Sequence, residues 1–190
     1  MAMVTAIAPL VAPFLGSALL AGFGWRGTFA AVLLWGILSF VVVWRSDNQD
    51  GSSAGVYAQR FDAAGAAQGG ELRINESAAG GQYQPDVAAL DNGGFAVTWY
   101  NDHYGVSGTG SYGDVYVRGY SADGAPTSGQ ILANTPTAGQ SSQYQPAIAV
   151  LGDGSFVVTW RSDGQDGSGS GVYAQHFSAT GATQGSEFRV

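Results

Sequence analysis

The sequence lacks cysteine and lysine, and it holds few charges for its 190 residues. Without cysteine the chain can form neither a disulfide scaffold nor a thiolate metal site. All seven basic residues are arginines, against 14 carboxylates, and the formal net charge is −7. Because nucleic-acid binding needs a basic stripe to meet the phosphates, we expect no nucleic-acid partner for this acidic chain.

The first 25 residues also carry no charged side chain, and the first charged residue of the sequence is Arg26. Met3–Phe23 is a 21-residue apolar stretch, and a second apolar run covers Thr28–Val43. About 20 apolar residues suffice for a helix to span a bilayer. The sequence therefore predicts that residues 1–38 form apolar helices that attach the chain to a membrane. A secretory signal peptide is the alternative, although no basic residues precede the apolar stretch.

The rest of the sequence is dominated by an internal repeat. Ser39–Ile74 and Ser155–Val190 align without a gap, with 25 identities in 36 positions. A more divergent copy lies between them, where Phe95–Trp99 corresponds to Phe156–Trp160. Repetition at a period of roughly 55–60 residues indicates an array or a propeller.

Each complete unit contains four strand-like runs. In the last unit these are Gln143–Leu151, Ser155–Trp160, Val172–Phe177 and Glu187–Val190. Apolar residues alternate along the second run, and the turns between the runs are rich in Gly, Asn and Asp, as in β-hairpins.

The pattern predicts a mainly β fold of tandem four-stranded antiparallel units, an incomplete β-propeller-like array preceded by the apolar helices. A β-solenoid or a string of small sandwiches is the alternative. The expected units are a partial one at 39–75, a complete one at 76–134 and a third at 135–190 that is truncated in its last strand. Open strand edges at the ends of such an array are expected to bind other copies of the chain or further repeat units.

The N-terminal segment resembles a family of membrane transporters. Ala8–Phe29 carries the paired prolines Pro9 and Pro13, the small pair Gly16-Ser17 and the triplet Gly24-Trp25-Arg26. In this stretch of about 35 residues the chain is similar to helices five and six of major facilitator multidrug-efflux transporters. The resemblance implies a membrane-embedded helix pair and a cytoplasmic exit after helix six.

The junction between the two parts poses a conflict. Ser39–Trp44 is required both as the end of the second helix and as the first strand of the repeat. If the strand forms, only the 11 residues Thr28–Leu38 are left for the helix, fewer than a bilayer crossing needs. We interpret the junction as a join of unrelated coding pieces or as a rearranged gene product.

The repeats resemble those of large exported bacterial proteins. The residues that carry this likeness are Trp160–Asp163, Gln165–Gly167 and Gly171–Gln175, with their partners at Trp44–Asp47, Gln49–Gly51 and Gly55–Gln59. Over about 150 residues the chain is similar to repeats found with RTX-type calcium-binding arrays and surface adhesins. The resemblance implies an exported or cell-surface location, in conflict with the cytoplasmic exit above.

Four aspartates, two in each of two loops, are the candidate metal ligands. Asp47 and Asp50, like Asp163 and Asp166, lie three residues apart in Gly-rich loops. Carboxylates in such loops can converge on Ca²⁺, which takes six to eight oxygen ligands, so calcium is the one cofactor considered. The alternative, which the pattern favours, is that Asp and Gly shape the turns.

Nothing local in the sequence indicates catalysis. The two histidines show no paired spacing of the kind that binds a transition metal. Trp44, Trp99 and Trp160 end alternating strands and are expected in the core rather than on a sugar-binding surface. A carboxylate pair for glycoside hydrolysis would have to be assembled across units.

We therefore predict that the chain is not an enzyme but a non-catalytic structural or binding module from a large exported or adhesin-type protein. One alternative is a fragment of a major facilitator transporter. Another is a fragment of a propeller-type glycan hydrolase.

Overall fold

A computed structural model describes residues 40–51, 53–102, 113–136 and 141–190. The predicted apolar helices at 1–38 lie outside these residues. The described part of the chain contains no helix that could span a membrane. At the junction the strand forms, since β1 runs from Phe40 to Asp47.

The described strands group into three antiparallel units. The first unit contains β1 (Phe40–Asp47), β2 (Ala54–Phe61) and β3 (Ala67–Arg73). The second contains β4 (Gly81–Ala89), β5 (Phe95–Asp102), β6 (Gly113–Tyr120) and the short β7 (Ile131–Leu132). The third contains β8 (Ser142–Val150), β9 (Phe156–Asp163), β10 (Ser170–Phe177) and β11 (Thr183–Arg189). The prediction of a mainly β fold is confirmed.

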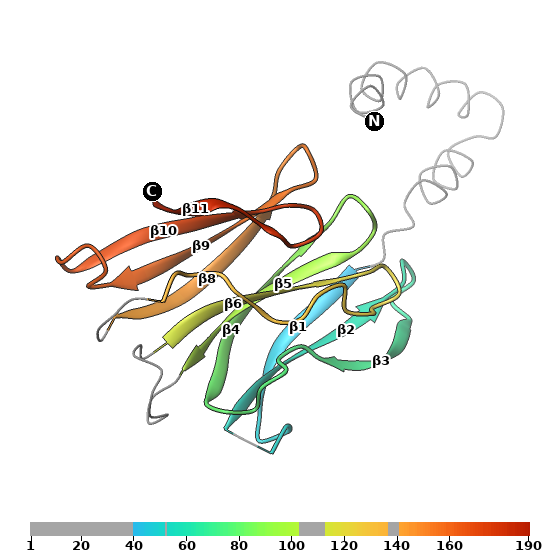
Figure 1. The fold of residues 1–190 in the computed structure, drawn as a ribbon. Helices are drawn as coiled ribbons and strands as arrows, with labels where there is room; N and C mark the ends of the chain where they lie inside the picture. Colours follow the sequence, from blue (N-terminus) through green and yellow to red (C-terminus); the bar gives the residue numbers. More distant parts are fainter. Residues whose placement is uncertain (1–39, 52, 103–112, 137–140) are drawn as a thin grey trace, which may run out of the picture. The chain divides into compact units, whose positions relative to one another are not determined.

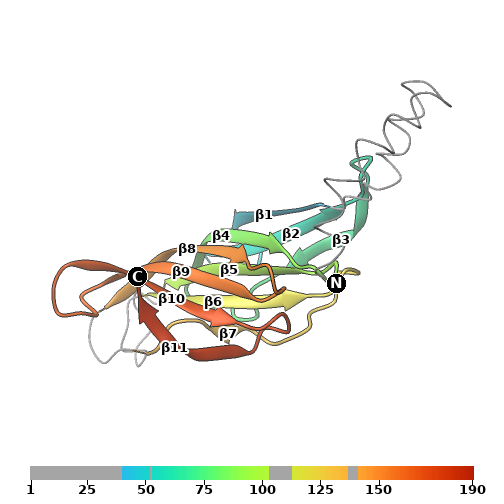
Figure 2. The ribbon, with the colours of Figure 1, turned by 90° about the horizontal axis from the view of Figure 1, so that it is seen from above.

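The units follow one another in chain order (Figures 1 and 2). Each is joined to the next by a single parallel bridge, Ala54 with Gly81 and Gly113 with Ser142. In the second and third units neighbouring strands pair antiparallel. For example, β9 pairs with β10 at eight positions, from Phe156 with Phe177 to Asp163 with Ser170. Backbone pairing therefore holds each unit together, and other contacts must hold the units to one another.

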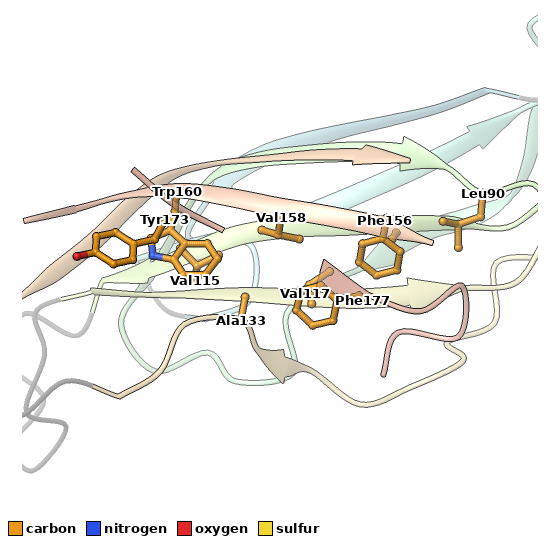
Figure 3. Close-up of a cluster of buried hydrophobic side chains, with 10 residues drawn as sticks. Leu90, Val115, Val117, Ala133, Phe156, Val158, Trp160, Tyr173 and Phe177 are labelled. Carbon is orange, nitrogen blue, oxygen red and sulfur yellow. The ribbon is translucent and has the colours of Figure 1, made fainter. Parts of the chain in front are cut away.

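Two hydrophobic clusters supply those contacts, one at each junction between units. The cluster between the second and third units includes Val115 from β6 and Trp160 from β9, and Figure 3 shows these side chains directed toward each other. The cluster between the first and second units includes Val56 from β2 and Trp99 from β5. The alternating apolar residues of each second strand thus pack against the preceding unit. Trp99 and Trp160 are buried, as core residues are.

The chain divides into two compact parts. Nearly all described strand residues belong to the larger part, Val41–Arg60 with Ala67–Val190. In the smaller part the described residues are Phe40 and the turn 61–66. There the Phe40 and Phe61 rings stack with centroids 5.1 Å apart, and Asp62 Oδ1 accepts the backbone N–H groups of Ala64 and Ala66.

Buried asparagines close the end of each of the first two units. Asn75 Oδ1 accepts a hydrogen bond from the Val56 N–H at 2.9 Å, and its Nδ2 donates to Gln82 Oε1 of the next unit at 3.0 Å. Asn134 occupies the equivalent place and accepts from the Val115 N–H at 2.7 Å. These amides satisfy backbone groups that would otherwise be buried unpaired, which costs about 1–3 kcal/mol each.

The buried hydroxyl of Tyr120 should make the stability of the junction between the first and second units depend on alkaline pH. The hydroxyl donates to the Ile74 carbonyl at 3.3 Å, and burial raises its pKa to about 12. A phenol whose pKa is higher in the folded state contributes stability that is complete below pH ~10 and is lost as the pH rises through ~12, about 3 kcal/mol in all.

We therefore expect the Tyr120→Phe variant to lose less stability between pH 9 and pH 12 than the native chain in denaturant titrations. At pH 7 the variant should be nearly as stable, because Arg118 Nη1 still donates to the Ile74 carbonyl at 3.0 Å. Parallel alkaline profiles for the two proteins would contradict this assignment.

Candidate functional site

A polar pocket of about 310 Å³ lies at the junction of the second and third units, and we call it the inter-unit pocket. Its walls come from the ends of β5 and β9 and from the beginnings of β6 and β8. The lining residues are Gln84, Tyr100, Asp102, Gly113, Ser142, Gln143, Tyr144 and Asp163.

Two carboxylates line this pocket from neighbouring units. Asp102 ends β5 and Asp163 ends β9, so the two occupy equivalent positions in the repeat. Each follows the buried tryptophan of its strand by three residues. The fold therefore brings together two acidic groups that are 61 positions apart in the sequence (163 − 102).

Hydrogen bonds fix the Asp163 carboxylate. Its Oδ1 accepts from Ser170 Oγ at 2.5 Å, and its Oδ2 accepts from Tyr144 Oη at 2.5 Å. Arg161 Nε donates to Oδ1 at 3.2 Å. The hydrogen bonds from Ser170 and Tyr144, with the Arg161 charge, lower the pKa of Asp163 below its usual value. This carboxylate is therefore ionised at neutral pH and well into the acidic range.

Two tyrosines provide aromatic walls. Tyr144 lies under the Arg161 guanidinium, whose carbon is 5.0 Å from the ring centroid. The Tyr100 ring is tilted against that of Tyr83, with centroids 5.4 Å apart. Burial raises the pKa of both Tyr100 and Tyr144, and a neighbouring aspartate adds to the effect in each case. Both phenols are therefore neutral near pH 7 and can donate hydrogen bonds.

Gln143 gives the pocket a buried amide. Its Nε2 donates to Ser141 Oγ at 3.3 Å and to Ser162 Oγ at 3.2 Å. Within the described part of the chain, its buried Oε1 has no hydrogen-bond partner. Because Gln143 is 0% exposed, this acceptor is a local cost to stability rather than a group open to the pocket.

The first strands of the two units meet beside the pocket through repeated bulges. Gln84 and Gln145 precede prolines and adopt positive φ values of 51° and 54°, uncommon for residues with a side chain. Gln84 Oε1 accepts from the Gln145 N–H at 3.0 Å, and Asp86 Oδ2 accepts from the Ile148 N–H at 2.9 Å. These hydrogen bonds hold β4 and β8 in register across the pocket edge.

The aspartates predicted to bind calcium, two in each of two loops, contact other side chains of the chain. Asp47 is paired with Arg45 Nε at 2.8 Å, and Asp166 with Arg189 Nη1 at 2.9 Å. Asp50 accepts from Asn75 Nδ2 at 3.0 Å. Among the described residues no group of three or more His, Cys, Asp or Glu side chains is arranged to hold a metal ion. Calcium binding by Asp47, Asp50, Asp163 and Asp166 stays a prediction.

One contact outside the pocket involves serine, histidine and aspartate. His176 Nε2 lies 2.7 Å from Ser155 Oγ, which donates to Asp153 Oδ1 at 2.5 Å. In a nucleophilic triad the carboxylate orients the histidine, whereas here it binds the serine. These three side chains therefore anchor the β8–β9 turn to β10. They are not arranged as a catalytic triad, because the carboxylate contacts the serine and not the histidine.

Sequence reasoning missed the inter-unit pocket because its lining residues come from five separate strands, β4, β5, β6, β8 and β9. Asp163 was singled out only as a calcium ligand, and Tyr144 and Gln143 only as part of a strand. The available signal was the aspartate that recurs three residues after each tryptophan, at Asp47, Asp102 and Asp163.

No protein-family model matches the chain, and no curated protein matches it. The resemblances to major facilitator transporters and to RTX-type repeats therefore have no support from these comparisons. Among solved structures, the chain is similar to the endo-arabinase from Bacteroides thetaiotaomicron, with a TM-score of 0.50 and 10% sequence identity. The similarity covers 80% of this chain and 58% of the arabinase chain, so the chain spans less than two thirds of that enzyme.

This similarity supports a β-propeller-like fold for the repeats. It contradicts the prediction that the chain is not an enzyme, because the solved protein with the similar fold is an endo-arabinase. The prediction was wrong because it rested on the absence of local catalytic motifs. A propeller assembles its sites from separate units, where such motifs do not occur.

Proposed function

We propose that the chain is a glycan-hydrolysing module of the propeller type, with its site in the inter-unit pocket. The observation that carries the proposal is the pair of equivalent carboxylates, Asp102 and Asp163, that line one pocket from two units. Glycoside hydrolysis generally uses two carboxyl groups on either side of the scissile bond. The propeller-like fold and the name of the similar enzyme support this reading.

The reaction adds water across a glycosidic bond. One carboxylic acid donates a proton to the leaving oxygen as the bond from the anomeric carbon breaks. The other, as carboxylate, takes a proton from the attacking water or attacks the anomeric carbon itself. Asp163 fits the second role, because its hydrogen bonds keep it ionised. Asp102 would then be the proton donor.

The remaining pocket residues suit a sugar ring. Tyrosine rings offer a flat apolar surface for the C–H face of a sugar and a polar tip for its hydroxyls, as Tyr100 and Tyr144 would do here. A few convergent polar groups among aromatic walls are typical of a small-ligand pocket.

The proposal is tested with the full chain and a panel of polysaccharides that begins with arabinan and includes xylan, β-glucan and starch. We expect new reducing ends from at least one of them, measured colorimetrically. The anomeric form of the first product, read by NMR, then tells a retaining from an inverting mechanism. The absence of both cleavage and binding across the panel would overturn the proposal.

The cellular setting of this activity also stays a proposal. Membrane attachment through residues 1–38 and an exported or cell-surface position of the repeats are the sequence-based predictions. A glycan substrate outside the cell is consistent with an exported repeat.

A further inference from the structure

The exposed apolar side chains of the repeat units are confined to two places. Among the described residues, the exposed large hydrophobic side chains are Phe40 and Val42 on β1, and Leu151, Val172, Phe188 and Val190 in the third unit. We call the four in the third unit the third-unit face. The two groups lie on the first and the last of the three units. Because the units are repeats, each exposed residue can be compared with its equivalents in the other units.

The residues of the third-unit face are exposed, whereas the equivalent residues of the other units are buried or partly buried. Val172 is 49% exposed, whereas its equivalents Val56 and Val115 are fully buried. Leu151 is 41% exposed, whereas its equivalent Leu90 is 7% exposed. The remaining members follow the same rule: Phe188 corresponds to Leu72 and Ile131, and Val190 corresponds to Ile74 and Ala133, all of which lie in or against the two inter-unit clusters.

In both junctions the surface is covered by the second strand of the next unit. That strand contributes Val97 and Trp99 at the first junction and Val158 and Trp160 at the second. On β1 the equivalents are Val42, which is 44% exposed, and the half-buried Trp44. We call Val42 and Trp44 the first-unit face.

The first-unit face has nearly the sequence needed to cover the third-unit face. β1 reads FVVVWRSD and β9 reads FVVTWRSD, and they differ only at Val43 and Thr159. The side chains of Val158 and Trp160 that cover the second unit therefore recur unchanged in Val42 and Trp44. The contact that the first-unit face would make with the third-unit face therefore already occurs twice within the chain, once at each junction between units.

A groove of about 310 Å³ on the third unit supports this reading. Its lining includes Gln145, Arg161, Ser170 and Val172. The first three are the equivalents of Gln84, Tyr100 and Gly113 in the inter-unit pocket. The groove on the third unit is therefore lined by the equivalents of the residues that the second unit contributes to the inter-unit pocket.

We propose that a second copy of the chain docks head to tail, with its first-unit face seated on the third-unit face. The contact is heterologous, since the two surfaces differ, so it generates a closed ring or an open filament. Two copies would bring together six units, twice the three described here, within the range of about 4–8 blades in closed propellers.

The test uses sedimentation velocity on the full 190-residue chain, with the same mild detergent in every sample to accommodate the apolar N-terminal segment. The native chain should associate as its concentration rises. A carboxylate placed in either face should weaken the association by about 100-fold or more, because a charge must be desolvated without a partner. Val172→Asp blocks one face and Val42→Asp blocks the other, and each variant alone should stay monomeric.

An equimolar mixture of the two variants should form a one-to-one dimer and nothing larger, because one variant keeps an intact first-unit face and the other keeps an intact third-unit face. Ala179→Asp adds the same charge in an exposed turn of the third unit and should associate like the native chain. A third-unit face that paired with itself would lose association in Val172→Asp and keep it in Val42→Asp. Either that result or a native chain that stays monomeric would overturn the proposal.

Cross-linking gives a second measurement should a variant fail to fold. The chain has no cysteine, so Val42→Cys and Val190→Cys each introduce a single thiol. A short bifunctional thiol reagent should link the two variants when they are mixed and should leave each one alone unlinked. Linking of Val190→Cys to itself, without linking in the mixture, would count against the head-to-tail contact.

Discussion

Asp163→Asn is expected to abolish glycan cleavage while leaving the fold in place. The amide keeps the size of the carboxylate and can still accept the hydrogen bond from Tyr144. It cannot take a proton from water or form a bond to the anomeric carbon. Loss of a general acid or base typically lowers the rate by about 10²–10⁴-fold, so kcat should fall by at least that range with little change in KM.

The repeat supplies a matched control in Asp47→Asn. Asp47 has the same place at the end of β1 and pairs with Arg45 as Asp163 pairs with Arg161, but it does not line the inter-unit pocket. The control variant should keep most of the activity. Equal losses in the two variants, or a normal rate in Asp163→Asn with intact circular dichroism, would remove Asp163 from the mechanism.

The strands and the core were predictable because large apolar side chains alternate along each strand. In Phe156–Trp160 every second side chain is large and apolar, and such a strand must bury that face. The structure buries Phe156, Val158 and Trp160 against the second unit. The repeat carries the same conclusion to β5, whereas on β1 Phe40 and Val42 are exposed.

The site was not predictable because it depends on the distance between units. Asp102 and Asp163 line one pocket only because β5 and β9 lie on two sides of one junction, a placement that depends on the packing of whole units. The Gln84 and Gln145 bulges beside it need positive φ at residues that usually avoid it. No local pattern signals either feature.

Trp160 carries the largest stability effect that we expect. It is 1% exposed and lies in the cluster that joins the second and third units. Replacing a buried tryptophan by alanine costs about 3–5 kcal/mol, from lost burial and the cavity left behind. Trp160→Ala should therefore loosen the third unit, and hydrogen exchange should accelerate in β8–β11 more than in β1–β3.

Two further variants separate burial from side-chain chemistry. Among the described residues, the buried Trp160 Nε1 has no hydrogen-bond partner, so Trp160→Phe removes an unsatisfied donor along with part of the ring. Its cost should be about 1–2 kcal/mol, well below that of alanine. Trp44→Ala makes the same change in the equivalent strand, where the ring is only half-buried, and should cost the isolated chain less than Trp160→Ala. If chemical denaturation gave equal losses for Trp44→Ala and Trp160→Ala in a monomeric sample, the inter-unit cluster could not be the main source of stability, because only Trp160 belongs to it.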